Sequence, residues 1–179
     1  MTLSRCYYKN RVTADLILKQ NYTSIMELPS FHKITCSNSS KEYILDKKNI
    51  FVSMVALELI TGQKVKYNVA KKSIAGFKLR QNQVIGCNVT LRKNKMYTFF
   101  EKFIFSVAGG MRNFTQKKLN FNNYDITLTN FNLFFELQRN YEIFRGVKGI
   151  GINLIAKVRK KEDASLLYSA MQLPVKIIK

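Results

Sequence analysis

The chain contains the sequence Ile85-Gly86-Cys87-Asn88-Val89-Thr90-Leu91-Arg92, in which two kinds of side chain alternate. The odd-numbered residues are apolar, and the even-numbered residues are glycine, polar or basic. A period of two is typical of a β-strand that buries one face and leaves the other polar. We therefore predict a strand here, with its odd-numbered side chains on a hydrophobic core.

Further strands and helices are predicted on both sides of this strand. Shorter alternations predict strands from Pro29 to about Cys36, over residues 65–69, around Ile126 to Leu128 and over residues 150–158. Helical spacing of apolar residues predicts helices over residues 7–20, 46–61, 96–107 and 164–171. Asp46 is the expected N-cap of the second helix, and Gly62 is its expected end.

These elements interleave, and their connections differ in length. The sequence has no linker rich in proline, glycine or serine and no internal repeat, so we expect a single domain over residues 1–179. The expected fold class is α+β, with helices packed on one face of a mostly antiparallel sheet. Two segments stand outside the regular pattern, a long basic loop at residues 70–82 and an Asn-rich region at residues 113–135.

The charge balance indicates a polyanionic partner. Thirty Lys and Arg residues face eleven Asp and Glu residues, which gives a formal net charge of +19. So large an excess costs self-repulsion in the folded state and is typical of proteins that bind nucleic acid. No apolar run reaches the roughly 18 residues of a membrane-spanning helix, so we expect no membrane insertion.

The basic loop is the densest group of charges outside the predicted helices and strands. It contains the sequence Ala70-Lys71-Lys72-Ser73-Ile74-Ala75-Gly76-Phe77-Lys78-Leu79-Arg80. Its cations can neutralise phosphates, Gly76 admits a close backbone approach, and Phe77 can stack on a base or ribose. A solvated hairpin tip is the alternative interpretation, and RNA contact is the favoured one.

The sequence offers no grouping of residues for catalysis or metal binding. The single histidine, His32, lies in an alternating strand, and the carboxylates are scattered. Cys6, Cys36 and Cys87 lie far apart without a zinc spacing, which is typical of buried thiols in a reducing compartment. Motifs of serine hydrolases, phosphate-binding loops and zinc proteases are absent. We therefore expect a protein that is not an enzyme and needs no cofactor or metal.

Three segments resemble the core motifs of a known family. They are Ile60-Thr61-Gly62-Gln63-Lys64, the loop sequence from Ala70 to Arg80, and the strand from Ile85 to Arg92. In this order and spacing they resemble the universal large-subunit ribosomal protein numbered five, the family that binds 5S rRNA. Tyr7-Tyr8-Lys9 and Leu173-Pro174 extend the resemblance towards both ends of the sequence.

The resemblance implies an α+β structural protein of the central protuberance of the large ribosomal subunit, acting in translation. The implied partners are 5S rRNA or its divergent counterpart, large-subunit rRNA, the peptidyl-site tRNA, neighbouring central-protuberance proteins and, through an intersubunit bridge, a protein of the small-subunit head. The family's long loop reaches the tRNA, which implies tRNA contact for Lys71, Lys72, Ser73, Ala75, Gly76, Phe77, Lys78 and Arg80. The resemblance also implies rRNA contact for Lys33, Ser37, Gln63, Lys64, Thr90 and Arg92, with Ser37 standing where the family has an Asn.

Two departures from the family pattern bear on the setting. Residues 36–42 replace a glycine-containing segment of the family and keep only its glutamate, at Glu42. Residues 121–124 stand where the family has a longer, glycine-rich stretch. With a composition rich in Lys, Asn, Ile, Phe and Tyr, these departures indicate a divergent mitochondrial ribosome. We expect a protein of the mitochondrial matrix, encoded in the organelle, and we disfavour a plastid setting.

Two other functions fit a basic chain of this composition. An organellar intron maturase or endonuclease would need acidic metal ligands at repeated helix ends, and the sequence has none. A free organellar RNA-binding protein would act away from the ribosome, so sedimentation discriminates it from a ribosomal protein.

Overall fold

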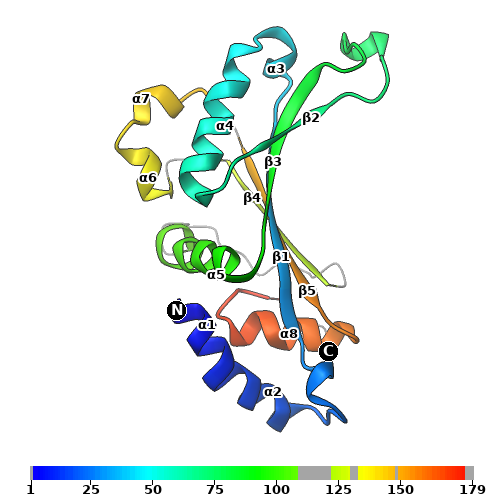
Figure 1. Ribbon diagram of the computed structural model, residues 1–179, viewed down its shortest axis with the longest axis vertical. Coiled ribbons are helices and arrows are strands. Elements are labelled where there is room, and N and C mark those ends of the chain that lie inside the picture. Colours follow the sequence, from blue (N-terminus) through cyan, green and yellow to red (C-terminus); the bar gives the residue numbers. More distant parts are fainter. Residues whose placement is uncertain (1, 109–121, 130–132, 148, 176–179) are drawn as a thin grey trace. The chain divides into compact units, whose positions relative to one another are not determined.

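A computed structural model describes residues 2–108, 122–129, 133–147 and 149–175 of the chain (Figure 1). Within them, five strands form one sheet in the order β2-β3-β1-β5-β4. The strands are β1 (Ser30–Ser39), β2 (Lys66–Val69), β3 (Val84–Leu91), β4 (Asn123–Leu128) and β5 (Ile150–Lys157). The sheet is antiparallel and is accompanied by helices, so the predicted α+β fold class is confirmed.

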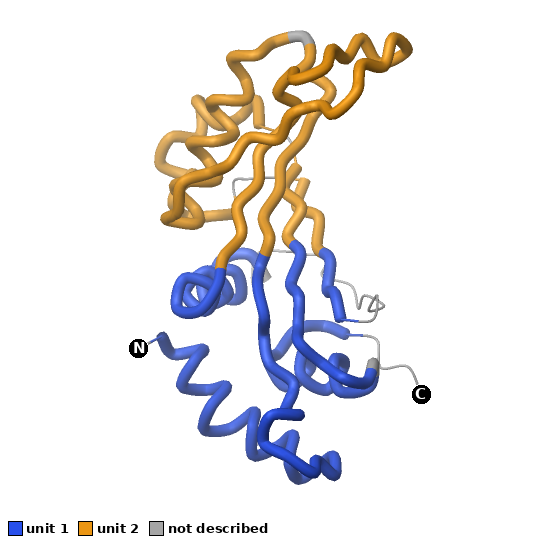
Figure 2. The backbone as a smooth tube through the Cα atoms, turned by 45° about the vertical axis from the view of Figure 1, so that its right-hand side comes forward, with its two compact units in different colours: residues 1–34, 92–125, 153–179 blue, residues 35–91, 126–152 orange. Residues whose placement is uncertain are grey.

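The chain divides into two compact units, each built from separate segments (Figure 2). Unit 1 comprises residues 1–34, 92–125 and 153–179, and unit 2 comprises residues 35–91 and 126–152. Three strands, β1, β4 and β5, contribute residues to both units, whereas β2 and β3 belong to unit 2.

Unit 1 begins with a helix that starts earlier than predicted. It consists of α1 (Leu3–Tyr7), a π-helical turn (Tyr8–Val12) and α2 (Thr13–Lys19), where the sequence predicted a helix over residues 7–20. Val12 and Leu16 lie on the predicted apolar face, and both are buried. The helical period therefore identified the packed face correctly even though it missed the first turn.

The core of unit 1 is aromatic. Phe31 of β1 packs against Phe100 of α5 (Lys93–Lys102), with ring centroids 5.2 Å apart, and against Tyr168 of α8 (Lys161–Ala170) at 5.7 Å. A π-helical turn (Phe103–Ala108) continues α5. The predicted apolar stripe of this helix is buried at Met96, Phe99, Phe100, Phe103 and Val107. An aromatic stripe at helical spacing is core here, as predicted.

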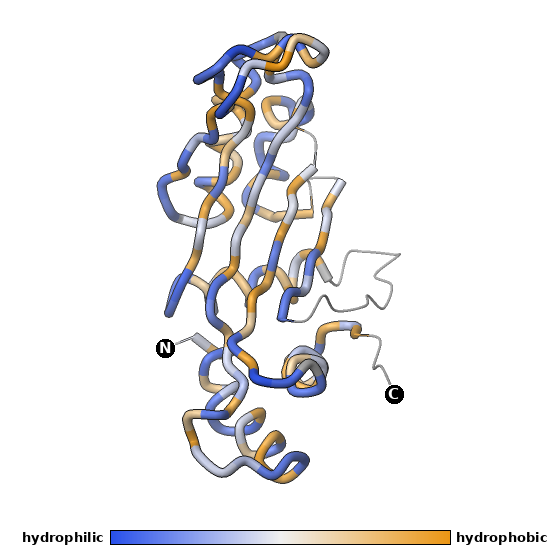
Figure 3. Tube along the Cα trace, turned by 90° about the vertical axis from the view of Figure 1, so that its right-hand side faces the viewer, coloured by the Kyte–Doolittle hydropathy of each residue, from blue (hydrophilic) through white to orange (hydrophobic). Residues whose placement is uncertain are grey.

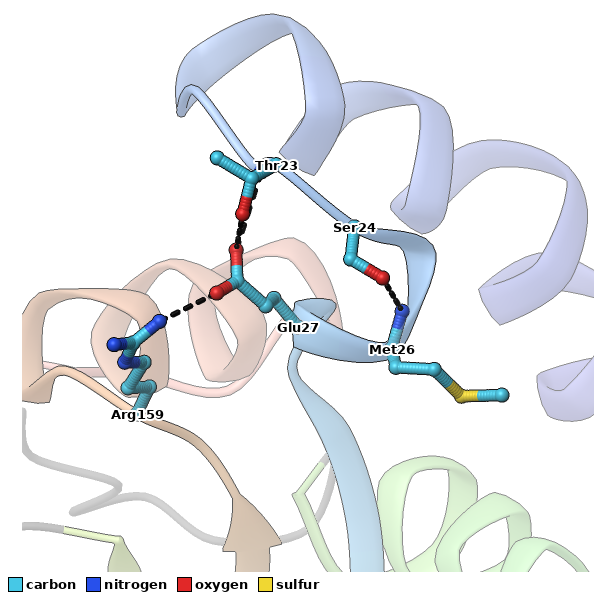
Figure 4. Close-up of polar contacts among 5 residues, drawn as sticks. All are labelled: Thr23, Ser24, Met26, Glu27 and Arg159. Carbon is cyan, nitrogen blue, oxygen red and sulfur yellow. Dashed lines mark hydrogen bonds and ion pairs between the residues drawn. The ribbon is translucent and has the colours of Figure 1, made fainter.

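The turn before β1 is held by one carboxylate (Figure 4). Glu27 accepts hydrogen bonds from the backbone N–H and the hydroxyl of Thr23, at 3.1 and 2.9 Å. Arg159, which follows β5, donates to the other carboxylate oxygen at 2.5 Å. The Thr23 hydrogen bonds, followed by the charge of Arg159, lower the pKa of Glu27. This ionised carboxylate therefore links the segment before β1 to the segment after β5.

The helices of unit 2 differ from the prediction at one end. The sequence predicted one helix over residues 46–61, and the structure has α4 (Lys48–Thr61) there. A short helix that was not predicted, α3 (Glu42–Leu45), precedes it. The predicted cap at Asp46 is wrong, because Asp46 is extended and ends α3, and Lys47 precedes α4 without a side-chain cap. Gly62 ends α4 as predicted, with the left-handed φ of 61° that favours glycine.

A buried polar network joins β1 to the helices of unit 2. The side-chain nitrogen of Asn38 donates to the carbonyl of Gly149 at 2.6 Å. The Tyr43 hydroxyl donates to the side-chain oxygen of Asn38 and lies 2.5 Å from the Ser53 hydroxyl of α4. Asn38, Tyr43 and Ser53 are each at most 2% exposed, so their hydrogen bonds replace water that cannot reach them.

Two short helices of unit 2 were not predicted. α6 (Phe135–Gln138) and α7 (Tyr141–Phe144) lie beside α4 (Figure 1). Each helix is about one turn long, which is too short for an apolar period to appear in the sequence. In the Asn-rich region at 113–135, residues 113–121 and 130–132 lie outside the described residues, while 123–128 form β4.

Candidate nucleic-acid interface

The two faces of β3 differ in chemistry, and hydrophobic and hydrophilic residues alternate along the strands (Figure 3). Cys87, Val89 and Leu91 are buried, whereas Asn88 and Thr90 are only half-buried. The predicted alternation is therefore confirmed from Cys87 to Leu91, whereas Ile85, predicted to lie on the core, is only half-buried. The alternation also holds for β5, where Ile150, Ile152, Leu154 and Ala156 are buried.

The pairing of β2 with β3 adds two polar side chains to the same face. Lys66 lies opposite Asn88, and Asn68 lies opposite Gly86. Directly opposite residues in an antiparallel pair point to the same side of a sheet. We call this polar side of unit 2 the open face, and its members are Ser37, Ser39, Lys66, Asn68, Gly86, Asn88 and Thr90.

Glycines leave the open face without bulky side chains at two positions. A Cβ atom on Gly86 would lie 2.5 Å from the carbonyl oxygen of Asn38 and 3.0 Å from the Cβ of Ser39, so no larger residue fits. A Cβ atom on Gly151 would lie 3.2 Å from the Ser37 hydroxyl. Small side chains at these positions allow a nucleic-acid backbone to approach the strands closely.

The residues predicted to contact rRNA fall into two sets. Ser37 and Lys64 are exposed and Thr90 is half-buried, all in unit 2. Lys33 and Arg92 belong to unit 1, where Lys33 is half-buried and Arg92 is exposed just before α5.

Gln63, which is also predicted to contact rRNA, makes a hydrogen bond within the protein. Its side-chain nitrogen donates to the backbone carbonyl of Thr90 at 3.1 Å. The amide of this half-buried residue therefore fixes the segment after α4 to the end of β3, next to the open face.

The basic loop is ordered by its own backbone. Ala70 and Gln83 close its base through a hydrogen bond of 2.9 Å, and Ile74 and Leu79 exchange two bonds of 3.1 Å further out. The Ser73 hydroxyl accepts a hydrogen bond from the backbone N–H of Gln81 at 2.9 Å. Ser73 therefore helps to build the loop, in addition to any contact that it makes with a partner.

The tip of the loop presents an unpacked aromatic ring between cations. Ala75–Phe77 form a 3-10 turn, and the Phe77 side chain is 63% exposed. Lys71, Lys72, Lys78 and Arg80 are all exposed. Gly76 has an ordinary negative φ and open space around it, so the fold of the loop does not itself require glycine there.

Sequence reasoning missed Lys66 and Asn68 as members of the open face. The signal was present, because Val65, Tyr67 and Val69 form the apolar set of that strand and leave the even-numbered residues on the other side. Strand pairing supplied what the sequence lacked, namely which side of β2 continues the polar side of β3.

The described residues bring together no three His, Cys, Asp or Glu side chains that could hold a metal ion. Burial raises the pKa of the Cys36 thiol to about 12 and that of Cys87 to about 11, which suits unreactive core residues. Cys6 is half-buried. Over the same described ranges, no helix has the length and apolar character to cross a membrane.

The chain matches two family models that together span most of it. A model described as Ribosomal protein L5 matches residues 24–80, and a model of the C-terminus of the same ribosomal family matches residues 84–175. Large ribosomal subunit protein uL5m of Prototheca wickerhamii is 45% identical, covering 94% of this chain and 81% of the relative.

Two further relatives match over almost their whole length. Large ribosomal subunit protein uL5 of Blochmanniella floridana is 35% identical, covering 98% of this chain and 94% of the relative. Large ribosomal subunit protein uL5m of Reclinomonas americana is 36% identical, covering 94% and 95%. The chain therefore belongs to the ribosomal protein L5 family, whose members are structural, non-enzymatic constituents of the large ribosomal subunit.

Proposed function

We propose that this chain is a structural constituent of the large subunit of a mitochondrial ribosome, in its central protuberance. The open face binds 5S rRNA or its divergent counterpart together with large-subunit rRNA. The basic loop contacts the peptidyl-site tRNA. In this setting the chain adjoins other central-protuberance proteins and bridges to a protein of the small-subunit head.

The observation that carries the RNA-binding part is the open face. This surface presents hydrogen-bond donors and one cation, from Lys66, Asn68, Asn88 and Thr90. Glycine and serine residues beside them add no bulky side chains. Cations neutralise phosphates, and short polar side chains reach ribose hydroxyls and base edges in the shallow groove of an RNA helix. The formal charge of +19 adds salt-dependent affinity.

The basic loop supports a second RNA contact at a distinct place. Lys71 and Lys72 offer charge to phosphates, and the exposed ring of Phe77 offers a surface for stacking. A hydrogen-bonded loop loses little conformational entropy when it binds, because its backbone is already ordered.

Two observations favour the mitochondrial setting. Relatives named uL5m, the mitochondrial-type form, match over most of this chain. The composition is also rich in Lys, Asn, Ile, Phe and Tyr. We infer a location in the mitochondrial matrix and a gene in the organelle.

Sedimentation of an organelle extract through a sucrose gradient tests the proposal. The chain is expected to co-migrate with large subunits and to remain with them when the salt concentration is raised moderately. Recovery of the chain only in light fractions with free RNA would instead favour the alternative of an RNA-binding protein that acts off the ribosome. Sequencing of RNA crosslinked to the chain then identifies which rRNA segments it contacts.

A further inference from the structure

One face of α4 is apolar and exposed. Phe51, Val55 and Leu59 follow each other at intervals of four residues, and their side chains are 68%, 48% and 46% exposed. The packed face of the same helix is also apolar, with Ile50 and Leu57 buried. A helix that is apolar on all sides normally has partners on all sides. The described elements that pack on α4, namely β3, α3, α6 and α7, leave the stripe of Phe51, Val55 and Leu59 largely exposed.

A groove continues this stripe toward the base of the basic loop. Its volume is about 790 Å³, and all of its lining residues belong to unit 2. Phe51 belongs to both the stripe and the groove, and Met54 and Tyr67 line the groove beside it. Tyr67 pairs with Cys87 in the register of β2 and β3, so it lies on the opposite side of the sheet from the open face. The groove therefore lies on the other side of the sheet from the proposed rRNA contact. It shares Lys78 and Arg80 with the basic loop that we propose to contact the tRNA.

Cations surround the groove. Lys47, Lys78 and Arg80 line it, and none of the described lining residues is acidic. All three cations are exposed. An occupant must therefore combine apolar side chains for the stripe with negative charge for the rim.

We propose that the α4 surface, made of Phe51, Val55, Leu59 and this groove, docks an apolar helix with acidic flanks from a neighbouring large-subunit protein. A ridge of side chains at intervals of four residues is what one helix offers another, and it anchors partners at matching intervals. The inference rests on the proposed place of the chain in the large subunit.

Three other occupants fit less well. A second copy of the chain would bring two net charges of +19 together. RNA would set hydrated phosphates against the aliphatic side chains of Val55 and Leu59, which offer no hydrogen bonds. An anionic membrane could cover the exposed stripe but could not enter the concave groove that Met54 lines.

Photocrosslinking in assembled large subunits tests the inference. A benzophenone side chain is placed at Val55 in one variant and at Lys66, on the open face, in a second. Position 55 is expected to crosslink to a protein segment that is rich in Asp and Glu. Position 66 is expected to crosslink to rRNA. Lys47→Glu should lower the crosslink yield at position 55 several-fold. It should leave α4 folded, because an acidic residue at a helix N-terminus is favourable.

The outcomes distinguish the docking of an acidic helix from the proposed function of the chain. Crosslinks from position 55 to rRNA, to lipid or to a second copy would overturn the docking of an acidic helix, and so would the absence of any crosslink in subunits that contain the chain. If position 66 still reaches rRNA, the proposed function stands without the inference. If the unsubstituted chain does not enter large subunits, both proposals fall.

Discussion

The Tyr43 hydroxyl lies at the centre of the buried polar network of unit 2, between Asn38 and Ser53. Tyr43→Phe removes the donor to the side-chain oxygen of Asn38 without changing the shape of the ring. Loss of a donor to a buried acceptor costs about 1–3 kcal/mol, so the free energy of unfolding should fall by about that amount. The shift of the urea midpoint of the isolated chain measures it.

Tyr67→Phe is the matched control for this substitution. Tyr67 is 57% exposed, so water replaces whatever its hydroxyl loses, and the change should stay within about 0.5 kcal/mol. If Tyr43→Phe lowered the free energy of unfolding as little as Tyr67→Phe does, the network would not stabilise unit 2.

The burial of single residues was predictable where an alternating pattern showed on which face of a strand each side chain lies. The alternation in residues 85–92 is by itself enough to place Cys87, Val89 and Leu91 in the core, where all three are buried. Asn38 shows where such reasoning stops. Its parity matches buried Ile34 and Cys36, but the Tyr43 hydroxyl and the Gly149 carbonyl that satisfy it come from elsewhere in the chain. No local pattern encodes such pairings.

The loop between β2 and β3 allows a prediction at the scale of one element. Replacing Lys71, Lys72 and Lys78 with Ala should weaken tRNA-dependent steps of translation more than it weakens assembly of the large subunit. The side chains are exposed, and the hydrogen bonds that order the loop come from other groups, so the fold should survive. Subunit yield on gradients and tRNA binding to purified ribosomes give the two readouts.

Removal of the same charge elsewhere separates position from net charge. Lys9, Lys157 and Lys160 are exposed in unit 1, and their replacement with Ala removes three charges outside the loop. This control should leave the peptidyl-site tRNA interaction unchanged. If the loop variant instead blocks assembly as strongly as it blocks tRNA binding, the loop is an rRNA anchor.

Continuous helical segments of several turns were predictable, and isolated four-residue helices were not. The aromatic period of α5 and the apolar faces of α2 and α4 emerged from the sequence because they repeat over several turns. α6 and α7 have four residues each and fold against α4, so their stability comes from tertiary contacts that leave no period in the sequence. The start of α4 was misplaced because an aspartate signals a possible cap, while the path of the chain after α3 decides whether it is used.

For the whole chain, charge predicts a polyanionic partner, and the sheet supplies the surface that we propose for it. A formal charge of +19 indicates a polyanion but gives no direction. The pairing of β2 with β3 gathers Lys66 and Asn68 with Asn88 on one side of the sheet, and this is why we propose that side as the binding surface. The α4 surface was not predicted, since a helix apolar on both sides offers no sequence signal of which side stays exposed.

The open face is polar and the α4 surface is apolar, so we predict that, of these two surfaces, only the open face contributes to salt-dependent RNA binding. The logarithm of the chain's affinity for rRNA extracted from large subunits should fall linearly with the logarithm of the salt concentration. The reason is that Lys and Arg side chains that bind phosphates release the counterions held by the RNA. Lys64→Gln with Lys66→Gln should reduce the steepness of that plot by about 1.4–1.8, since each lost phosphate contact removes about 0.7–0.9. Val55→Ser should leave the slope unchanged, because it alters only the α4 surface. The opposite pattern, with the slope altered by Val55→Ser alone, would show that RNA lies on the α4 surface and that the open face serves another partner.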